Sequence, residues 1–257
     1  MTRHADPDKE NGHDYTMIES DRTRGALVTS LKGSVLASCQ AGPGSPLNLP
    51  STIAAIAQSA ELGGAQGFRV DGPENVAAVR AVSDLPILGI NKVDRDGYDV
   101  RITPTLEDAL EVVRAGANII ALDGTERPRP NGESLAQIIA ALHEIGVPVM
   151  ADVSTHREAL AAVEAGVDIV ATTLAGYTPD TLHLDRSGPA FPLLQEIRDL
   201  PVPIIVEGRI WTTHHVASCF EGGAYAVIIG SAITVPELIT RRFVAAAREA
   251  QRTAVAS

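Results

Sequence analysis

Cysteine is scarce in this chain, which has only 2 cysteines in 257 residues. Cys39 and Cys219 lie far apart in the sequence and do not show the spacing of a metal-ligand set. They can form at most one disulfide, and nothing in the sequence indicates export. We therefore expect two buried thiols, and a small disulfide-stabilised scaffold is excluded.

Positive charge is also scarce, with 21 Lys and Arg against 32 Asp and Glu and a formal net charge of −11. Nucleic acids and anionic membranes are bound through clustered cationic side chains, so neither partner is expected. A local site for a small anion remains compatible with this balance. Only three of these cationic residues are lysines, namely Lys9, Lys32 and Lys92. A lysine at the end of a strand is therefore a stronger candidate for a functional residue than it would be in a lysine-rich chain.

Long apolar runs are absent, and no stretch of 18 uncharged apolar residues is available to span a membrane. The first 24 residues lack the apolar segment of a signal peptide. Residues 1–20 are polar and charged without apolar periodicity, which predicts a disordered tail followed by one folded domain over residues 21–257. These features together predict a cytoplasmic protein.

Apolar segments of two kinds alternate along the chain. One kind follows a glycine at the end of a helical pattern, and these glycines recur about 50 residues apart at Gly64, Gly116, Gly166 and Gly223. The other kind begins with proline, as in Leu85-Pro86-Ile87, which is tolerated at the first residue of a strand. Together they predict eight strands, near residues 34–40, 65–70, 86–92, 117–123, 147–152, 167–172, 202–207 and 225–230.

Amphipathic helical patterns follow these strands, as in Leu106–Arg114 with Thr105 placed to cap its N-terminus. Apolar strands that alternate with such helices are typical of a parallel sheet covered by helices. Eight strand–helix units predict an α/β fold, a closed (β/α)8 TIM barrel. An open doubly wound sheet is the alternative, but Gly42-Pro43-Gly44 after the first strand lacks the GxGxxG spacing of its phosphate loop.

The active site of a (β/α)8 barrel lies at the carboxyl ends of the strands. Polar or small residues at the expected ends are Gln40, Arg69, Lys92, Asp123, Asp152, Thr172, Thr173, Glu207, Arg209, Gly230 and Ser231. Lys92 and Glu207 belong to strands three and seven, on opposite sides of the barrel mouth. An amine with a lowered pKa and a carboxylate placed in this way can act on both faces of one carbon. The alternative is a solvated loop lysine and an ion-paired rim carboxylate.

Gly208 with Arg209, and Gly230 with Ser231, follow strands seven and eight. Barrels of this kind commonly bind phosphate at this position, through backbone N–H groups and the N-terminus of a short helix. We therefore expect these four residues to form a phosphate-binding site.

Other polar residues at the strand ends allow more than one interpretation. Thr173 and Tyr177 follow the sixth strand, where Tyr177 either lines the substrate pocket or packs within a loop. Asp123 and Asp152 have the chemistry of metal ligands. No histidine lies at a strand end, so neither a metal nor another cofactor is expected.

Nine short motifs, taken in order, resemble those of the N-acylglucosamine-6-phosphate 2-epimerases, also called N-acetylmannosamine-6-phosphate 2-epimerases. They are Ser38–Gln40, Gly67–Arg69, Gly89–Lys92, Ile102–Thr105, Ala121–Asp123 with Arg127–Pro130, Ala151–Thr155, Thr172–Thr178, Glu207–Arg209 and Gly230–Thr234. The resemblance extends from Thr29 to Thr240, which is nearly the whole expected domain. Each motif is short, but nine in register are specific.

The resemblance implies a metal-free barrel that interconverts N-acetylmannosamine 6-phosphate and N-acetylglucosamine 6-phosphate by moving one proton at C2, in sialic acid catabolism. On this pattern Lys92 and Glu207 match the catalytic lysine and glutamate of the family. Gln40, Arg69 and Asp152 match residues that contact the sugar and the two reacting groups. Val235 departs from the pattern, because the family commonly has arginine there, and this substitution bears on the sugar specificity.

Two other functions are compatible with the same residues. A Schiff-base aldolase or synthase would use Lys92 as a covalent nucleophile. A sugar-phosphate sensor would keep the barrel and lack catalysis.

The predicted C-terminal helix over residues 236–247 has an apolar face formed by Leu238, Ile239, Phe243 and Val244. It either closes the barrel or packs on a second subunit. The family resemblance implies a homodimer.

Overall fold

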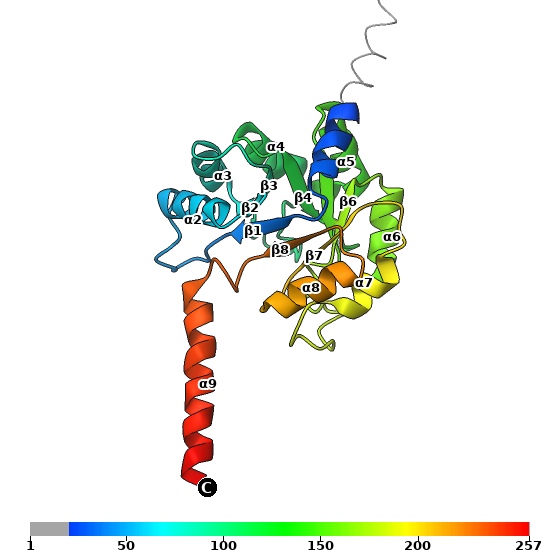
Figure 1. Ribbon diagram of the computed structural model, residues 1–257. Coiled ribbons are helices and arrows are strands. Elements are labelled where there is room, and N and C mark those ends of the chain that lie inside the picture. Colours follow the sequence, from blue (N-terminus) through cyan, green and yellow to red (C-terminus); the bar gives the residue numbers. More distant parts are fainter. Residues whose placement is uncertain (1–20, 257) are drawn as a thin grey trace, which may run out of the picture.

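The computed structural model describes residues 21–256 of the chain (Figure 1). Eight parallel strands form a closed barrel in the order β1-β2-β3-β4-β5-β6-β7-β8, which confirms the predicted TIM barrel. The strands are β1 Val35–Cys39, β2 Phe68–Asp71, β3 Ile87–Ile90, β4 Ile119–Asp123, β5 Val149–Asp152, β6 Ile169–Ala171, β7 Ile204–Glu207 and β8 Ala226–Ile229. The predicted tail at residues 1–20 lies outside the described residues.

Each strand is followed by a helix. The helices are α2 Pro50–Leu62, α3 Pro73–Arg80, α4 Leu106–Arg114, α5 Leu135–Glu144, α6 His156–Glu164, α7 Phe191–Ile197, α8 Thr213–Glu221 and α9 Pro236–Ala256. Local sequence sets several of the starts. Thr105, Ser134 and Thr155 each cap the helix that follows, and in each case the residue three positions later completes a capping box.

Side chains on the strands alternate between two apolar layers, as the two-residue period of a strand requires. One layer packs between the sheet and the surrounding helices and includes Ala37, Phe68 and Val206. The other fills the inside of the barrel and includes Leu36 and Ile205. Residues of the inner row therefore point toward the barrel axis along the whole length of each strand.

The amino end of the barrel is closed by the first described segment. Residues 21–30 are helical, and Val28 and Leu31 join the inner apolar layer. Arg24 holds this segment in place by donating to Asp168 at 3.0 Å, and His143 lies 2.8 Å from the same carboxylate. The opposite, carboxyl end of the barrel is therefore the end open to a substrate.

Helix α9 does not cover the barrel. It stands away from the strands in Figure 1, and residues 240–254 are all exposed. In a TIM barrel the helix after the last strand packs on the outside of the sheet. Of the two roles considered for this helix, closure of its own barrel is therefore wrong. The helix is also longer than expected, because it continues from Pro236 to Ala256.

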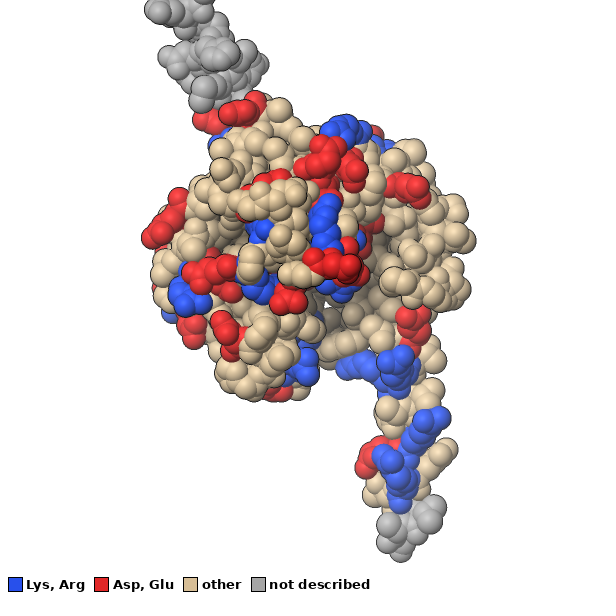
Figure 2. Space-filling view, turned by 180° about the vertical axis from the view of Figure 1, so that it is seen from behind, with Lys and Arg blue, Asp and Glu red and all other residues tan. Residues whose placement is uncertain are grey.

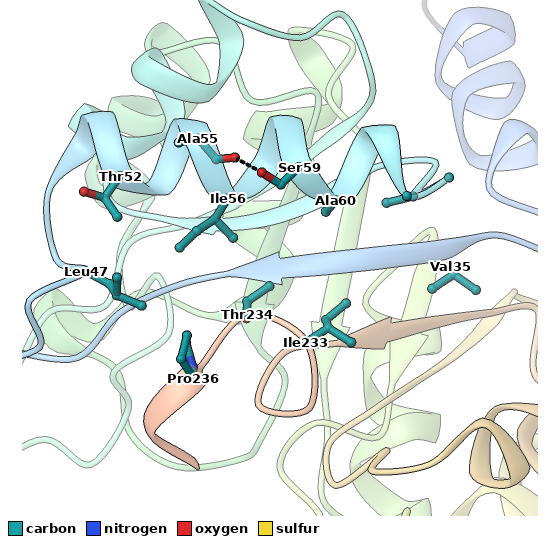
Figure 3. Close-up of a pocket in the computed structure, with 13 residues that line it drawn as sticks. Val35, Leu47, Thr52, Ala55, Ile56, Ser59, Ala60, Ile233, Thr234 and Pro236 are labelled. Carbon is teal, nitrogen blue, oxygen red and sulfur yellow. Dashed lines mark hydrogen bonds between the residues drawn. The ribbon is translucent and has the colours of Figure 1, made fainter. Parts of the chain in front are cut away.

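An apolar groove of about 650 Å³ lies beside the start of α9, between α2 and the segment that leads out of β8. Figure 3 shows Leu47 and Ile56 on one side of this groove and Ile233 and Pro236 on the other. Among the described residues, no helix is long and apolar enough to cross a membrane.

Candidate active site

The inner row of most strands ends in a functional side chain at the open end of the barrel. The residues that continue these rows are Gln40, Asp71, Lys92, Asp123, Asp152, Thr173, Glu207 and Gly230. These residues lie on the inner face because of the two-residue period of a strand. For example, Gln40 and Glu207 follow the inner residues Leu36 and Ile205 by an even number of positions. The inner apolar layer therefore lies directly beneath a ring of polar side chains.

Arg69 joins two carboxylates inside this ring. Its Nη1 and Nη2 donate to the two oxygens of Asp152 at 2.9 and 2.6 Å, and Nη1 also donates to Glu207 Oε2 at 2.6 Å. The exposed fractions of the three side chains are 1% for Arg69, 0% for Asp152 and 12% for Glu207. The Arg69 guanidinium therefore holds Glu207 by one carboxylate oxygen, Oε2.

Thr173 lies between the same two carboxylates. Its hydroxyl donates to Asp152 Oδ1 at 2.6 Å and lies 3.2 Å from Glu207 Oε2. Burial raises the pKa of Glu207 to about 7, although the positive charge of Arg69 opposes the shift. Near neutral pH, Glu207 is therefore able both to accept and to give up a proton.

Lys92 lies two residues beyond the end of β3, and its position is fixed at both ends of the residue. Its backbone N–H donates to Asp71 Oδ1 at 2.9 Å. Its Nζ donates to Gln40 Oε1 at 2.5 Å and lies 3.9 Å from Asp71 Oδ2. Gln40 comes from β1 and Asp71 from β2, so three adjacent strands hold the ammonium group.

Desolvation at the barrel mouth lowers the pKa of the Lys92 ammonium. The carboxylate of Asp71 opposes this shift, and the positive charge of Arg69 adds to it. An amine with a lowered pKa reaches its neutral form at a lower pH than an exposed lysine. Lys92 is therefore the second group of the ring that is suited to proton transfer.

The four residues expected to bind phosphate surround one small cavity of about 120 Å³, together with Ser38 and Glu207. Gly208 and Gly230 have only backbone atoms to present to it. The Arg209 guanidinium is engaged elsewhere, because Nε and Nη1 donate to the carbonyls of Gly188 and Ala175 at 2.7 Å each. The cavity therefore offers a place for an anion next to the carboxylate cluster.

Tyr177 and Asp123 were also expected at the site, but neither hydrogen-bonds to the cluster around Arg69 or to the group around Lys92. The Tyr177 ring is about half exposed and lies 5.3 Å from the Arg209 guanidinium. The Asp123 carboxylate accepts bonds from Thr125 and Arg127 at 2.6 Å each. Asp123 therefore stabilises the loop after β4.

Asp71 and Ser38 belong to the site but were not among the residues expected from the sequence. The expected second strand ended at residue 70, so Asp71 fell outside it, although it lies two positions after Arg69 on the same row. Ser38 lies two positions before Gln40 in β1 and accepts from the Gln40 amide at 2.7 Å. The two-residue period identifies both once the end of the strand is known.

A carboxyl group with a pKa near neutrality and an amine with a lowered pKa lie on β7 and at the end of β3, four strands apart in a ring of eight. Strands four apart in such a ring lie across the barrel from each other. A small molecule bound between them presents one face to each group. The arrangement is suited to removing a proton from one side of a carbon atom and adding one to the other side.

Known proteins resemble the chain over most of its length. A family model described as "Putative N-acetylmannosamine-6-phosphate epimerase" matches residues 53–249. A protein of Clostridioides difficile described as "Putative N-acetylmannosamine-6-phosphate 2-epimerase" is 42% identical over 221 residues, which cover 86% of this chain and 98% of the relative. A protein of Thermosynechococcus vestitus with the same description is 44% identical over 222 residues, or 86% and 96% of the two chains.

A solved structure of the N-acetylmannosamine-6-phosphate 2-epimerase from Clostridium perfringens has the same fold, with a TM-score of 0.82 and 37% sequence identity. The match covers 85% of this chain and 95% of that chain. The family model spans well over half of the sequence, and the curated relatives agree with it. The chain therefore belongs to the N-acetylmannosamine-6-phosphate 2-epimerase family.

Proposed function

We propose that this protein is an isomerase that interconverts N-acetylmannosamine 6-phosphate and N-acetylglucosamine 6-phosphate by proton transfer at C2. The observation that carries the proposal is the placement of Glu207 and Lys92 across the barrel mouth, each with a pKa shifted toward neutrality. Membership of the epimerase family supports the choice of substrate.

The chemistry requires one base and one acid on opposite faces of C2. In the open-chain form of either sugar, C2 lies next to an aldehyde, so its proton is acidic. Ionised Glu207 removes this proton from one face, and the Lys92 ammonium returns a proton to the other face, which inverts the carbon. The reverse reaction uses neutral Lys92 as the base and protonated Glu207 as the acid.

The remaining residues of the site bind the substrate or stabilise the anion formed when C2 loses its proton. Removal of the C2 proton leaves negative charge on the aldehyde oxygen, and the Arg69 guanidinium and the Gln40 amide are the nearby positive and hydrogen-bonding groups. Asp152 and Thr173 hold Arg69 and Glu207 in place. We assign the 6-phosphate to the cavity formed by Gly208, Arg209, Gly230 and Ser231, and we place Tyr177 at the outer rim of the substrate pocket.

Epimerisation in deuterium oxide is expected to give product that carries one deuterium at C2, because the returned proton comes from a side chain that exchanges with solvent. The experiment incubates the enzyme with N-acetylmannosamine 6-phosphate and follows both the remaining substrate and the epimer formed by mass spectrometry and proton NMR. The control is Lys92→Met, which is expected to give no epimer. Product without deuterium would contradict proton transfer through an exchanging side chain, and a borohydride-trapped adduct on Lys92 would favour a Schiff base.

We also propose that the enzyme is a homodimer in which α9 of each protomer packs on the other barrel. Three apolar residues, Ile239, Phe243 and Ala246, lie on one face of α9, and Phe243 is 74% exposed. The groove between α2 and the residues after β8 is apolar and lies where a TIM barrel carries its last helix. A second copy of α9 has the size and chemistry to fill this position.

Charge supports the same partner. Helix α9 carries four arginines, Arg241, Arg242, Arg248 and Arg252, against two glutamates, Glu237 and Glu249, and positive side chains predominate along it in Figure 2. The whole chain has a net charge of −11. A basic helix and an acidic barrel attract each other, and because α9 stands away from its own barrel, the barrel of a second copy is the partner left for it.

Replacing Phe243 by glutamate is expected to convert the dimer to a monomer, because the substitution places a charge in the centre of the apolar face. Light scattering should report twice 27.0 kDa for the natural protein and 27.0 kDa for the variant. Gln251→Glu is the matched control, since it adds the same charge to an exposed position of α9, and it should remain dimeric. A mass of 27.0 kDa for the natural protein would refute the dimer.

The cellular setting follows from the same proposal. Cys39 and Cys219 are both buried free thiols, as expected from the sequence, and free thiols persist in reducing compartments. We therefore place the enzyme in the cytoplasm, in the catabolism of sialic acid, where phosphorylated amino sugars are interconverted.

A further inference from the structure

Ser38 connects the cavity assigned to phosphate with the group that holds Lys92. Its Oγ accepts from Gln40 Nε2 at 2.7 Å, and the other end of the same amide, Oε1, accepts from Lys92 Nζ. Ser38 also lines the cavity formed by Gly208, Gly230 and Ser231. One buried side chain, only 7% exposed, therefore touches both parts of the site.

The Gln40 amide has two different ends, and only one of them suits a cation. The carbonyl oxygen accepts from an ammonium group, whereas the NH₂ end would place donor against donor. The Ser38 oxygen accepts from the NH₂ end and thereby turns the carbonyl toward Lys92. A serine oxygen that accepts this bond still has its own hydrogen to donate, and the cavity lies beside it.

The segment after β8 is held tightly against Ser38. Thr234 Oγ1 donates to the Ser38 carbonyl at 2.7 Å and to the Gly230 carbonyl at 3.0 Å. A methyl group added at Gly230 would lie 3.2 Å from Ser38 Cβ and 3.4 Å from Ser38 Oγ, so a larger residue would press on Ser38. The segment that lines the cavity and Ser38 are therefore in direct contact.

We propose that Ser38 is a positioning residue that links occupation of the phosphate cavity to the placement of Lys92, so that the 6-phosphate of the substrate raises the rate of proton transfer as well as the affinity. When the phosphate is bound, the Ser38 hydroxyl donates to it, and the Ser38 lone pair holds the Gln40 amide in the orientation that Lys92 requires. Binding energy from a remote group of the substrate is thereby used at the reacting carbon. The inference rests on the proposed epimerase function.

The charged groups around Lys92 determine the direction of the pH effect. The Lys92 ammonium is faced by Asp71 from β2, by Arg69 from the same strand, and by Asp152 and Glu207 from β5 and β7. The Gln40 carbonyl adds an acceptor that favours the charged form. Loss of the correct amide orientation is therefore expected to lower the pKa of Lys92 and to move the alkaline limb of the pH profile of kcat to lower pH.

The test compares Ser38→Ala with Ser231→Ala in the full-length enzyme. For Ser38→Ala we expect kcat for N-acetylmannosamine 6-phosphate to fall by about tenfold to a hundredfold, with KM changed by less than about twofold. Ser231→Ala should raise KM more than Ser38→Ala does and lower kcat less, because Ser231 lines the cavity, whereas Ser38 also accepts from the Gln40 amide. Ser38→Cys keeps the size of the side chain but has a weak acceptor, so it should show the same split as Ser38→Ala.

A second measurement separates positioning from binding. Unphosphorylated N-acetylmannosamine is assayed with and without added phosphite, a dianion that resembles the end of the phosphate ester. Phosphite should accelerate its epimerisation by the natural enzyme, and this acceleration should fall in Ser38→Ala by the same factor as kcat. Melting temperatures of the variants close to that of the natural protein exclude misfolding as the cause.

The outcomes are distinct. If the natural enzyme does not epimerise the 6-phosphate, the proposed function fails. If it does, and Ser38→Ala either has unchanged kinetics or raises KM alone, the positioning role of Ser38 is wrong while the function stands. An unchanged alkaline limb in Ser38→Ala would also overturn the role assigned to the Gln40 amide.

Discussion

Replacing Glu207 by glutamine is expected to lower kcat for epimerisation by about 10²- to 10⁴-fold in both directions, the usual range for loss of a general acid or base. The amide has almost the same shape and can still accept from Arg69 at the position of Oε2. It cannot take up the C2 proton, so exchange of deuterium into the substrate should fall by the same factor. Initial rates and deuterium incorporation measure the two effects.

Glu221→Gln is the matched control for this variant, because Glu221 is an exposed carboxylate at the end of α8. It should leave kcat unchanged. Exchange at the natural rate in Glu207→Gln would show that another residue removes the proton.

Glu207 also determines how the rate of epimerisation is expected to depend on pH. In either direction the active pair of Glu207 and Lys92 shares one proton, because one group must be the acid and the other the base. Acidification protonates Glu207, whose pKa is about 7, and leaves both groups protonated. We therefore expect kcat/KM to fall below pH 7 in both directions, whereas a profile that stays flat to pH 5 would contradict the assignment.

Replacing Arg69 by methionine is expected to lower the free energy of unfolding by about 3–5 kcal/mol and to abolish activity. The substitution leaves the fully buried carboxylate of Asp152 without its cation, which is the costly way to break a buried ion pair. Denaturant unfolding followed by circular dichroism measures the loss. Arg101→Met is the control, because Arg101 pairs with Asp94 at the surface, where such a pair contributes about 0–1 kcal/mol.

A double variant tests the cause of this effect. Arg69→Met combined with Asp152→Leu removes the fully buried carboxylate together with its cation, so only Glu207, which is 12% exposed, is left without a cation. We expect the double variant to recover much of the lost stability and to stay inactive. If it is less stable than the single variant by the full cost of a second core substitution, the loss comes from packing and not from the unpaired charge.

The sequence was sufficient to predict the barrel, the approximate position of every strand and most of the residues at the strand ends, although not Asp71. These features depend on local patterns, namely proline before a strand, glycine after a helix, and the two-residue and helical periods. Leu36, Ser38 and Gln40 illustrate this, because one alternating row carries a core residue, a positioning residue and a site residue. The roles assigned to Lys92 and Glu207 still await the experiments above.

Features that depend on side-chain direction over long distances could not be predicted. The Arg209 guanidinium turns to two backbone carbonyls, because residues 175 and 188 happen to present them. The position of α9 also could not be predicted, since its apolar face fits either its own barrel or a second copy. In both cases the sequence allows two partners, and only the geometry of the folded chain decides between them.

The ion pairs of Arg69 also join the two halves of the chain. Arg69 comes from the first four strand–helix units, whereas Asp152 and Glu207 come from the last four. A half-barrel paired with a copy of itself would therefore place guanidinium against guanidinium, or carboxylate against carboxylate, at the centre of the mouth. The charges that surround the substrate thus also specify which halves assemble, so that two fragments of this chain, divided after the fourth unit, should recombine only as unlike partners.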